Sequence, residues 1–354
     1  DLHLHRELAE IPNLFDLSSG QTVFTGDDAG IALVWNNGGS LRIDENTRVQ
    51  FVSDDTLYLK SGRIYFDSTP AKLAAAPALT EAAGCTVDFL DGPAMNLGRE
   101  QVASALKKSR PGLLVLHTTT PSIDSDLAYS SLAKELLADC KTVAVGPHVT
   151  AEPEDTLHRA QGSLDVVVRG EYDHTLREIA ELCNSSWSTT TLSEILGISY
   201  VDGEGKATHT ATRPYLDVNE LPFPAWQHID PRLYRDAGKR FPFITLISGR
   251  GCFGRCTFCR DVPLMEGRKL RLRDPELVAD EIEYDLDLFP YLREVMFETD
   301  TFTASSTHVS GICEEIVRRG LKITWSCNCR TDVDLKLLPL MKRAGCRMLM
   351  VGFE

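Results

Sequence analysis

The sequence lacks long apolar runs and any excess of positive charge. No window reaches the roughly 18 apolar residues that a membrane-spanning helix needs, and the first residues lack the apolar centre of a secretory signal. Lysine and arginine together number 37, against 51 aspartate and glutamate residues, which gives a formal net charge of −14. Nucleic acids and anionic lipids are bound by clustered basic side chains, so neither is an expected partner. We therefore expect a cytoplasmic protein with no membrane span.

The cysteines, of which there are ten, are not spaced like the disulfide framework of a small secreted domain. Three of them, Cys252, Cys256 and Cys259, follow one another at the spacing C-x3-C-x2-C. Thiolates at this spacing can hold three corners of a cubane iron–sulfur cluster, and the neighbouring glycines let the backbone fold around it. A fourth cysteine is absent from this stretch, which leaves one iron of such a cluster without a protein ligand.

A structural zinc site and three unrelated buried thiols are the alternatives for this stretch. Zinc sites normally complete a tetrahedron with a second pair of cysteines or histidines. Only Cys327 and Cys329 offer such a pair. The cluster is therefore the favoured interpretation.

The chain divides into four segments by its residue pattern. Residues 1–70 consist of short β-branched and aromatic runs between turn formers, which predicts antiparallel strands. Residues 71–185 alternate between helix and strand patterns, which is typical of a Rossmann-like parallel sheet covered by helices. Residues 186–240 are a weakly patterned linker, and residues 241–354 resume the alternation as the first four strands of a barrel. The predicted fold class is α/β: a partial barrel preceded by a Rossmann-like domain and a small all-β segment.

The element boundaries expected from these patterns are as follows. In the first segment, strands are expected at 22–25, 31–35, 40–44, 48–52, 56–60 and 63–67. In the second, helices are expected at 71–83, 99–109, 123–138 and 175–183, with strands at 86–90, 113–117, 142–145 and 165–168. In the fourth, strands are expected at 243–247, 294–297, 323–327 and 348–351, with helices at 275–288, 306–319 and 335–344.

The cysteine stretch, with the aromatic Phe258 directly before its last cysteine, resembles the signature of the radical S-adenosylmethionine superfamily. The resemblance implies a 4Fe-4S cluster on Cys252, Cys256 and Cys259, whose open iron binds the amino and carboxylate groups of S-adenosylmethionine. It further implies that the cluster cleaves this cofactor reductively and that Phe258 packs beside the adenine. A reductant such as flavodoxin or ferredoxin is then an expected partner.

The same resemblance assigns further S-adenosylmethionine contacts to the ends of the next strands. Glu298 and Asp300 match positions that accept hydrogen bonds from the ammonium group, although a literal Gly-Gly-Glu is absent. Farther on, three polar residues alternate toward one face and match positions that meet the carboxylate and the ribose: Ser326, Asn328 and Arg330. The alternatives are a solvated acidic turn and, for Arg330, a structural salt bridge.

The last residue, Glu354, would by resemblance approach the ribose of the cofactor. The family's partial barrel generally has six strands, whereas four are visible in this sequence. We therefore expect a truncated chain that lacks most of the contacts to its substrate.

Residues 71–185 resemble the cobalamin-binding domain that precedes the radical core in one large subgroup, through the stretches 87–92, 117–122, 145–149 and 168–172. Small hydroxylated residues and glycines at strand ends let a flat macrocycle approach the carboxyl edge of a sheet. The sequence has no Asp-x-His-x-x-Gly motif, so a purely structural domain is the alternative. The resemblance assigns the cobalamin contacts to Thr118, Thr119, Ser122, Gly146, His148, Gly170 and Glu171.

The N-terminal segment resembles the FecR-type β domain. The resemblance depends on the pattern Leu33-x-Trp35-x2-Gly38-x-Ser40-Leu41-x2-Asp44-x2-Thr47-Arg48 and on the ending Gly62-x2-Tyr65-x-Asp67. That domain usually lies outside the cytoplasmic membrane, which conflicts with an oxygen-labile cluster in the same chain.

The leading functional hypothesis is a cobalamin-dependent radical enzyme that methylates or rearranges an unactivated carbon. The stretches 300–303 and 325–328 are similar to members that modify hopanoid lipids, so the expected substrate is a small molecule or a lipid. One alternative is a FecR-like binding or signalling protein fused to an inactive radical S-adenosylmethionine fragment, and another is an electron-transfer protein. A redox carrier needs four ligands for its cluster, so three clustered cysteines favour the enzyme.

Overall fold

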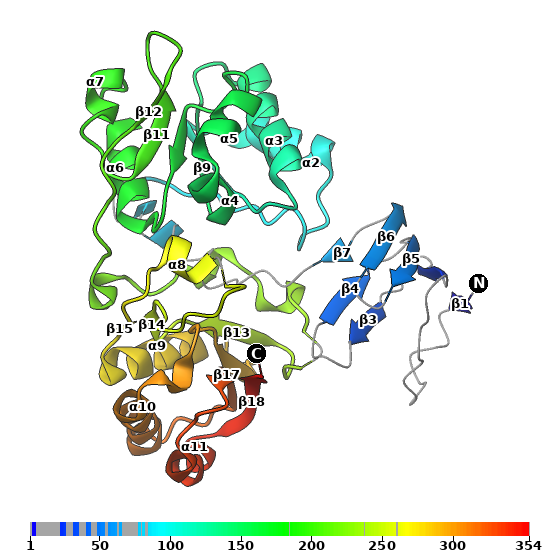
Figure 1. Cartoon of the computed structure of the whole chain (residues 1–354), viewed down its shortest axis with the longest axis vertical. Coiled ribbons are helices and arrows are strands. Elements are labelled where there is room, and N and C mark those ends of the chain that lie inside the picture. The colour runs from blue at the N-terminus through cyan, green and yellow to red at the C-terminus, as the bar shows by residue number, and fades with distance from the viewer. Residues whose placement is uncertain are drawn as a thin grey trace. The chain divides into compact units, whose positions relative to one another are not determined.

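The structure is a computed structural model. It describes residues 84–353 apart from 184, 237 and 260, the short helical stretches 77–78 and 80–81, and the backbone of the strands between residues 2 and 65. The chain forms two compact units, Asp1–Ser68 and Thr69–Glu354, which we describe separately (Figure 1).

The first unit contains two small sheets of short strands. One sheet has the order β1-β2-β5-β6 and the other the order β3-β4-β7, and every pairing except β1 with β2 is antiparallel. The six expected strands are present, with ends that differ by at most two residues: β2 (Thr22–Thr25), β3 (Ile31–Val34), β4 (Ser40–Ile43), β5 (Arg48–Ser53), β6 (Thr56–Ser61) and β7 (Ile64–Tyr65), preceded by β1 (Leu2–Leu4). Several residues of the FecR-like pattern lie outside the described residues, namely Trp35, Gly38, Asp44, Thr47, Gly62 and Asp67.

The α/β domain of the second unit has a five-stranded sheet with the order β12-β11-β10-β9-β8. The strands β8 (Leu113–His117), β9 (Lys141–Val145) and β10 (Val166–Val168) are parallel. Apolar residues of α6 and α7 pack on one face of this sheet, and those of α3 and α5 pack on the other. The helices are α2 (Arg99–Ser109), α3 (Ile123–Leu136), α4 (Pro147–Ala151), α5 (Pro153–Arg159), α6 (Asp173–Cys183) and α7 (Thr189–Leu192).

Two features of this domain differ from the sequence-based expectation. The stretch 86–90 joins no sheet, and its Phe89 packs instead against the hydrophobic cluster of the barrel part. The expected linker contains an antiparallel hairpin, β11 (Ile198–Val201) and β12 (Ala207–His209), which extends the sheet beyond β10. Both differences arise from long-range packing, which a local residue pattern does not report.

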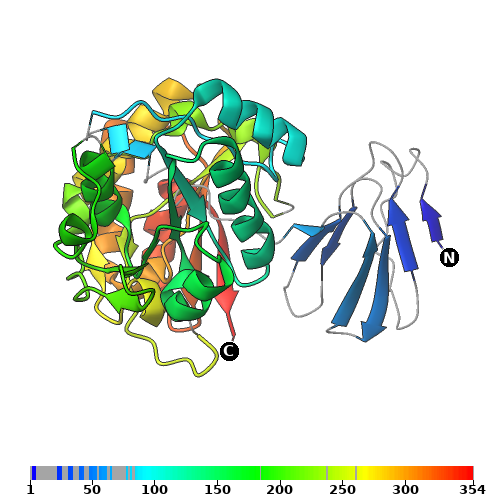
Figure 2. The same ribbon diagram turned by 90° about the horizontal axis from the view of Figure 1, so that it is seen from above.

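The barrel part has four parallel strands in the order β13-β16-β17-β18. They are β13 (Phe243–Leu246), β16 (Glu294–Phe297), β17 (Trp325–Arg330) and β18 (Cys346–Gly352). The helices α9 (Pro275–Leu288), α10 (Ser306–Arg319) and α11 (Leu338–Arg343) cover the outer face, where their apolar residues and those of the strands form one core (Figures 1 and 2). The bounds of α9, α10 and β16 are those expected, whereas the last expected helix begins as a 3-10 turn, η6 (Leu335–Leu337).

A short antiparallel pair, β14 (Gly249–Arg250) and β15 (Arg271–Leu272), follows β13. Its connection contains the three clustered cysteines and the short helix α8 (Asp261–Met265), which contacts α4 of the α/β domain. We call residues 251–270 the cysteine loop.

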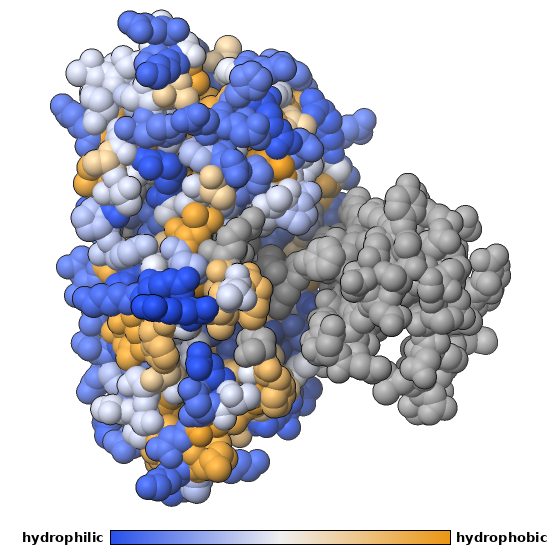
Figure 3. Space-filling view, in the orientation of Figure 1, coloured by the Kyte–Doolittle hydropathy of each residue, from blue (hydrophilic) through white to orange (hydrophobic). Residues whose placement is uncertain are grey.

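The surface of the second unit is largely hydrophilic on the face shown in Figure 3, with apolar patches between the polar areas. Within the described part of the chain, no helix combines the length and the apolar character required to cross a bilayer.

Candidate functional site

The cysteine loop brings two of its thiols to one small space at Gly254. A Cβ atom at this glycine would lie 3.2 Å from the sulfur of Cys252 and 3.9 Å from that of Cys256. All three loop cysteines are free and partly exposed. Because Gly254 has no side chain, the sulfurs of Cys252 and Cys256 can both approach its backbone.

The loop's backbone is shaped by close approaches and by a hydrogen bond to sulfur. Gly251 has a φ of +83°, and a Cβ there would lie 2.3 Å from the carbonyl oxygen of Lys269, so only glycine fits. The amide of Gly254 donates to the sulfur of Cys252 at 3.4 Å. This hydrogen bond links the Cys252 sulfur to the backbone of the turn that follows it.

The loop cysteines fit a cluster better than a single metal ion. Among the residues described, no three cysteine, histidine or acidic side chains lie close enough together to hold one ion. In a cubane each cysteine binds a different iron, so the sulfurs stand farther apart than the ligands of one zinc ion. Burial raises the pKa of both Cys327 and Cys329, the rival pair.

Arg330 lies beside the same space. Its Nη1 atom would be 3.5 Å from a Cβ at Gly254, and its Nε donates to Asp332 Oδ1 at 3.1 Å. The Asp332 carboxylate raises the pKa of Arg330, and the nearby Cys252 and Cys256 add to this effect. The guanidinium is thus a charged donor at the rim of the candidate cluster site.

Glu298, Asp300 and Asn328 lie at the same carboxyl edge. Phe297 of β16 pairs with Cys327 of β17. The next residue in each segment, Glu298 and Asn328, therefore lies one position nearer the carboxyl end. The side chains of Glu298 and Asp300 are partly buried, and the hydroxyl of Thr301 lies 3.6 Å from the Cys252 sulfur. Thr301 was not among the predicted site residues. It lies near Cys252 because β16 ends beside the cysteine loop.

Ser326 is not brought to this edge. Its side chain is fully buried, and its hydroxyl donates to Glu294 Oε1 at 2.5 Å. Glu294 begins β16, and Arg347 also pairs with it, so Ser326 belongs to a polar cluster near the opposite end of the strands. Phe258 is 67% exposed on the loop, and Glu354 lies outside the described residues.

The carboxyl edge of the α/β sheet holds the predicted cobalamin residues. Gly146 follows β9 with a φ of +115°, and a Cβ there would lie 2.4 Å from the carbonyl oxygen of Thr118. Thr118 is fully buried, and its hydroxyl donates to the carbonyl of Val145 at 2.9 Å. These two residues therefore hold the loops after β8 and β9 in contact.

Thr119 and Ser122 form a polar turn at the start of α3. Their hydroxyls lie 2.8 Å apart, and Ser122 Oγ donates to Asp126 Oδ2 at 2.7 Å. Burial raises the pKa of Asp126 to about 6, so its carboxyl group takes up a proton near neutral pH. The turn can offer both donors and acceptors to a ligand.

His148, in the first turn of α4, carries an orphaned ring nitrogen. The residue is 7% exposed, and its Nδ1 lies 3.2 Å from Thr120 Oγ1. Its Nε2 is buried and makes no hydrogen bond within the described structure. Leaving a buried polar atom unpaired costs about 1–3 kcal/mol, so a bound group that supplies a partner fits this position.

Gly170 and Glu171 lie where the two parts of the second unit meet. Gly170 has a φ of +74°, and a Cβ there would lie 4.0 Å from the carbonyl oxygen of Met265 in α8. The Glu171 carboxylate accepts from Arg271 through both oxygens, at 2.5 and 3.1 Å. Glu171 thus joins the α/β domain to the cysteine loop, and a cofactor would have to compete with this ion pair.

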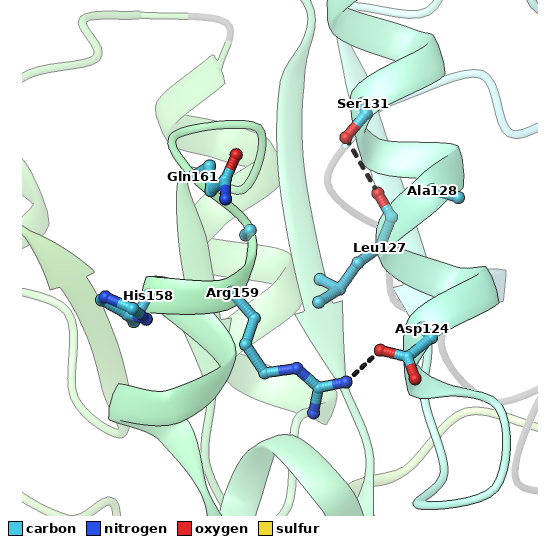
Figure 4. Close-up of a pocket in the computed structure, with 8 residues that line it drawn as sticks. Asp124, Leu127, Ala128, Ser131, His158, Arg159 and Gln161 are labelled. Carbon is cyan, nitrogen blue, oxygen red and sulfur yellow. Dashed lines mark hydrogen bonds and ion pairs between the residues drawn. The ribbon is translucent and has the colours of Figure 1, made fainter.

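A hollow elsewhere on the α/β domain involves other residues. It lies between α3 and α5, and Arg159 reaches across it to pair with Asp124 (Figure 4). Its lining includes none of the predicted site residues.

The comparison with protein families identifies one domain. Residues 61–180 match the B12 binding domain. The match includes every residue to which we assigned a cobalamin contact, from Thr118 to Glu171, and it begins ten residues before the expected boundary at residue 71.

Relatives of known sequence extend the similarity across the cysteine loop. The chain is 30% identical over 273 residues to an uncharacterised methyltransferase of Pyrococcus horikoshii, a match that covers 76% of this chain and 57% of the relative. It is 28% identical over 296 residues to the anaerobic magnesium-protoporphyrin IX monomethyl ester cyclase of Rubrivivax gelatinosus, with 80% and 51% covered. The chain thus spans about half the length of the curated relatives it matches.

A solved structure shows the same fold. The radical S-adenosylmethionine methyltransferase TsrM of Kitasatospora setae, determined with cobalamin and a 4Fe-4S cluster, matches with a TM-score of 0.65 at 18% identity. The match covers 81% of this chain and 56% of that one. The chain therefore contains a B12 binding domain and has the α/β fold of cobalamin-dependent radical S-adenosylmethionine enzymes.

Proposed function

We propose that this chain belongs to an enzyme that holds a 4Fe-4S cluster on Cys252, Cys256 and Cys259 and cleaves S-adenosylmethionine reductively, with cobalamin as a second cofactor. The observation that carries the proposal is the convergence of side chains at Gly254. The sulfurs of Cys252 and Cys256 and the Nη1 atom of Arg330 all lie within 4 Å of the Cβ position of this glycine, beyond the carboxyl end of β13. In a parallel α/β barrel this edge carries the chemistry.

The residues around this space have separate tasks in binding S-adenosylmethionine. Arg330 can hold the carboxylate by charge-assisted hydrogen bonds, while Glu298 and Asp300 accept from the ammonium group. Asn328, on the inner face, is assigned to the ribose, and Phe258 to the adenine. Ser326 is left out of this set because its hydroxyl is already bonded to Glu294.

The carboxyl edge of the α/β sheet is assigned to cobalamin. His148 offers its buried Nε2, and the turn of Thr119 and Ser122 offers hydroxyl groups. Gly146 lets the loops after β8 and β9 approach each other, and Gly170, whose Cβ position meets only the Met265 carbonyl at 4.0 Å, leaves room for the macrocycle to approach the backbone. When bound, the cluster supplies the electron that cleaves S-adenosylmethionine, and cobalamin supplies the cobalt centre for methyl transfer.

The proposed reaction is methylation or rearrangement of an unactivated carbon in a small molecule or a lipid, with a flavodoxin or ferredoxin as reductant. Methylation is supported by the methyltransferases among the similar proteins, and ring formation by the Rubrivivax cyclase. The FecR-like alternative depends largely on residues outside the described part of the chain.

The test is anaerobic reconstitution with iron and sulfide, followed by electron paramagnetic resonance of the reduced protein with and without S-adenosylmethionine. We expect a cluster signal that shifts when S-adenosylmethionine is added. The signal should be lost in Cys256→Ala and kept in Cys313→Ala, which removes a buried thiol outside the loop. A signal that ignores S-adenosylmethionine, or that survives in Cys256→Ala, contradicts the proposal.

A further inference from the structure

We propose that four buried charged side chains clamp the cysteine loop to the carboxyl edge of the α/β sheet and thereby set the distance between cluster and cobalamin. The clamp consists of Arg250 and Arg271 on the two stems of the loop, and of Glu171 and Asp173 after β10. The inference rests on the proposed function, because it assigns positioning residues to the two cofactors of that function.

The first stem of the loop is held by a bidentate ion pair. Arg250 ends β14, two residues before Cys252, and Asp173 begins α6. The guanidinium donates through Nη1 to Asp173 Oδ2 at 2.7 Å and through Nη2 to Oδ1 at 3.0 Å. The side chains are only 8% and 2% exposed. Two parallel hydrogen bonds fix orientation as well as distance, so the chain entering the loop cannot pivot on this contact.

The second stem is held in the same way. Arg271 begins β15 and donates to Glu171 Oε1 at 2.5 Å and to Oε2 at 3.1 Å. In the β14–β15 pair Arg250 and Arg271 are directly opposite each other, and Arg250 also lies 3.4 Å from Glu171 Oε1. Both ends of the cysteine loop are thus attached to one short stretch of the α/β domain.

That stretch directly follows a predicted cobalamin residue. Gly170 precedes Glu171 in the chain, just as Arg250 precedes the first cluster cysteine by two positions. The Arg250–Asp173 pair therefore connects a segment beside the first cluster cysteine to a segment beside the cobalamin site. Arg271 is farther along the chain from the cysteines and acts on the loop through its pairing with Arg250 in the β14–β15 ladder.

The clamp remains charged despite its burial. Burial alone would raise the pKa of Asp173, but the Arg250 guanidinium lowers it below its usual value. A third carboxylate, Glu266, accepts from the Gly251 amide at 3.0 Å and ties the loop's first residue to its far end. Well-packed apolar residues often stabilise a core as well as buried ion pairs do, so fixed geometry is the better account of this network.

A matched control exists within the barrel part. Arg273 and Glu281 form an ion pair of similar burial, with side chains 7% and 1% exposed. Arg273 follows β15 and Glu281 lies in α9, so this pair does not reach the α/β domain. The substitution Glu281→Gln removes the same charge as Glu171→Gln or Asp173→Asn, but leaves the clamp intact.

The first experiment measures amide hydrogen exchange in the full chain without cofactors. In Asp173→Asn we expect the exchange rate of amides 251–256 to rise about tenfold, because the first stem is released. In Glu171→Gln we expect the same rise for amides 266–272, because the second stem is released. Glu281→Gln should leave the loop as in the wild type. Unchanged loop exchange in the clamp variants, or an equal rise in the control, overturns the proposal. If Asp173→Asn does not fold, the exchange rates of Glu171→Gln alone test the proposal.

The second experiment uses protein loaded with cluster and cob(II)alamin and measures the distance between the two spins by pulsed electron paramagnetic resonance. The wild type and Glu281→Gln should give one narrow distribution, and Asp173→Asn a broadened or shifted one at unchanged cofactor content. Identical distributions in all variants overturn the clamp. If the wild type binds neither cofactor, the proposed function is wrong. The hydrogen-exchange experiment, which uses the chain without cofactors, still tests the clamp.

Discussion

At the scale of single residues, the cysteine loop depends on positions where a side chain would be in the way. Gly251 is required by its own backbone conformation and by the carbonyl of Lys269. Gly254 is different, because the atoms nearest to its missing Cβ are the Cys252 sulfur, Arg330 Nη1 and the Cys256 sulfur. Glycine at position 254 is therefore needed for the site and not for the fold.

Replacing Gly254 by alanine is expected to weaken cluster binding about tenfold, because the added methyl group overpacks the space beside two sulfurs. The measurement is iron content per chain after reconstitution at limiting iron. The control is Gly112→Ala, where an added Cβ meets no atom within 4 Å. Equal iron content in the two variants would mean that the space at Gly254 is not where the cluster sits.

Sequence patterns predicted the three loop cysteines more directly than the residues around them. Alternation along β17 correctly put Ser326, Asn328 and Arg330 on one face, but only the three-dimensional structure shows that Ser326 lies too far toward Glu294. Arg250 was missed because a single arginine between two glycines carries no periodic signal. Its role is apparent only when Asp173, distant in sequence, comes within hydrogen-bonding distance.

At the scale of helices and strands, amphipathic periodicity predicted the elements that pack against one continuous core. The bounds of α9 and α10 agree with the expectation because their buried residues recur at the helical period. The bounds of β16 agree because it is a short run in which all four residues are buried. Asp274 precedes Pro275 at the start of α9, but its side chain makes no capping hydrogen bond. Instead its amide donates to Asn219 Oδ1 at 2.8 Å.

The errors occurred where long-range packing decided the structure. The apolar run around Phe89 has the composition of a strand, yet it packs on the barrel core without pairing. The hairpin of β11 and β12 was assigned to a linker because its strands are short. Its turn is organised by Asp202, whose Oδ1 accepts from the amides of Glu204 and Lys206.

Helix α10 contains a histidine that makes stability depend on pH. Burial, together with the charge of Arg273, lowers the pKa of His308 to about 4. Since its unfolded pKa is higher, the unfolded chain binds more protons between these values, and stability is lost as the pH falls from 6.5 towards 4. We expect this residue to account for a loss of roughly 2 kcal/mol between pH 7 and pH 5.

Urea unfolding at pH 7 and pH 5 tests this expectation. His308→Gln should lose less stability than the wild type over this interval, because glutamine takes up no proton. The control His158→Gln alters an exposed histidine on α5 and should behave as the wild type. Equal losses in His308→Gln and the wild type would show that His308 is not the group responsible.

At the scale of the whole molecule, the second compact unit carries every residue that we assign to a cofactor, from Thr118 to Glu354. The clamp, the cysteine loop and the orphaned nitrogen of His148 all belong to this unit. Cofactor binding should therefore depend on its internal contacts alone.

Removing residues 1–60, which keeps the whole stretch matched to the B12 binding domain, is accordingly expected to leave the iron and cobalamin content per chain unchanged after reconstitution. The measurement compares both contents in the full and shortened chains, together with their unfolding midpoints in urea. A shortened chain that folds with the same midpoint but no longer binds cobalamin would show that the first unit contributes to that site.

The central claim is that the cluster has an open iron that binds S-adenosylmethionine beside Arg330. Electron–nuclear double resonance on the reduced cluster, with the carboxylate of S-adenosylmethionine labelled with oxygen-17, tests it most directly. We predict a strong oxygen coupling in the wild type that weakens in Arg330→Ala, because the guanidinium no longer orients the carboxylate. A reduced cluster with no oxygen coupling at saturating S-adenosylmethionine would contradict the account.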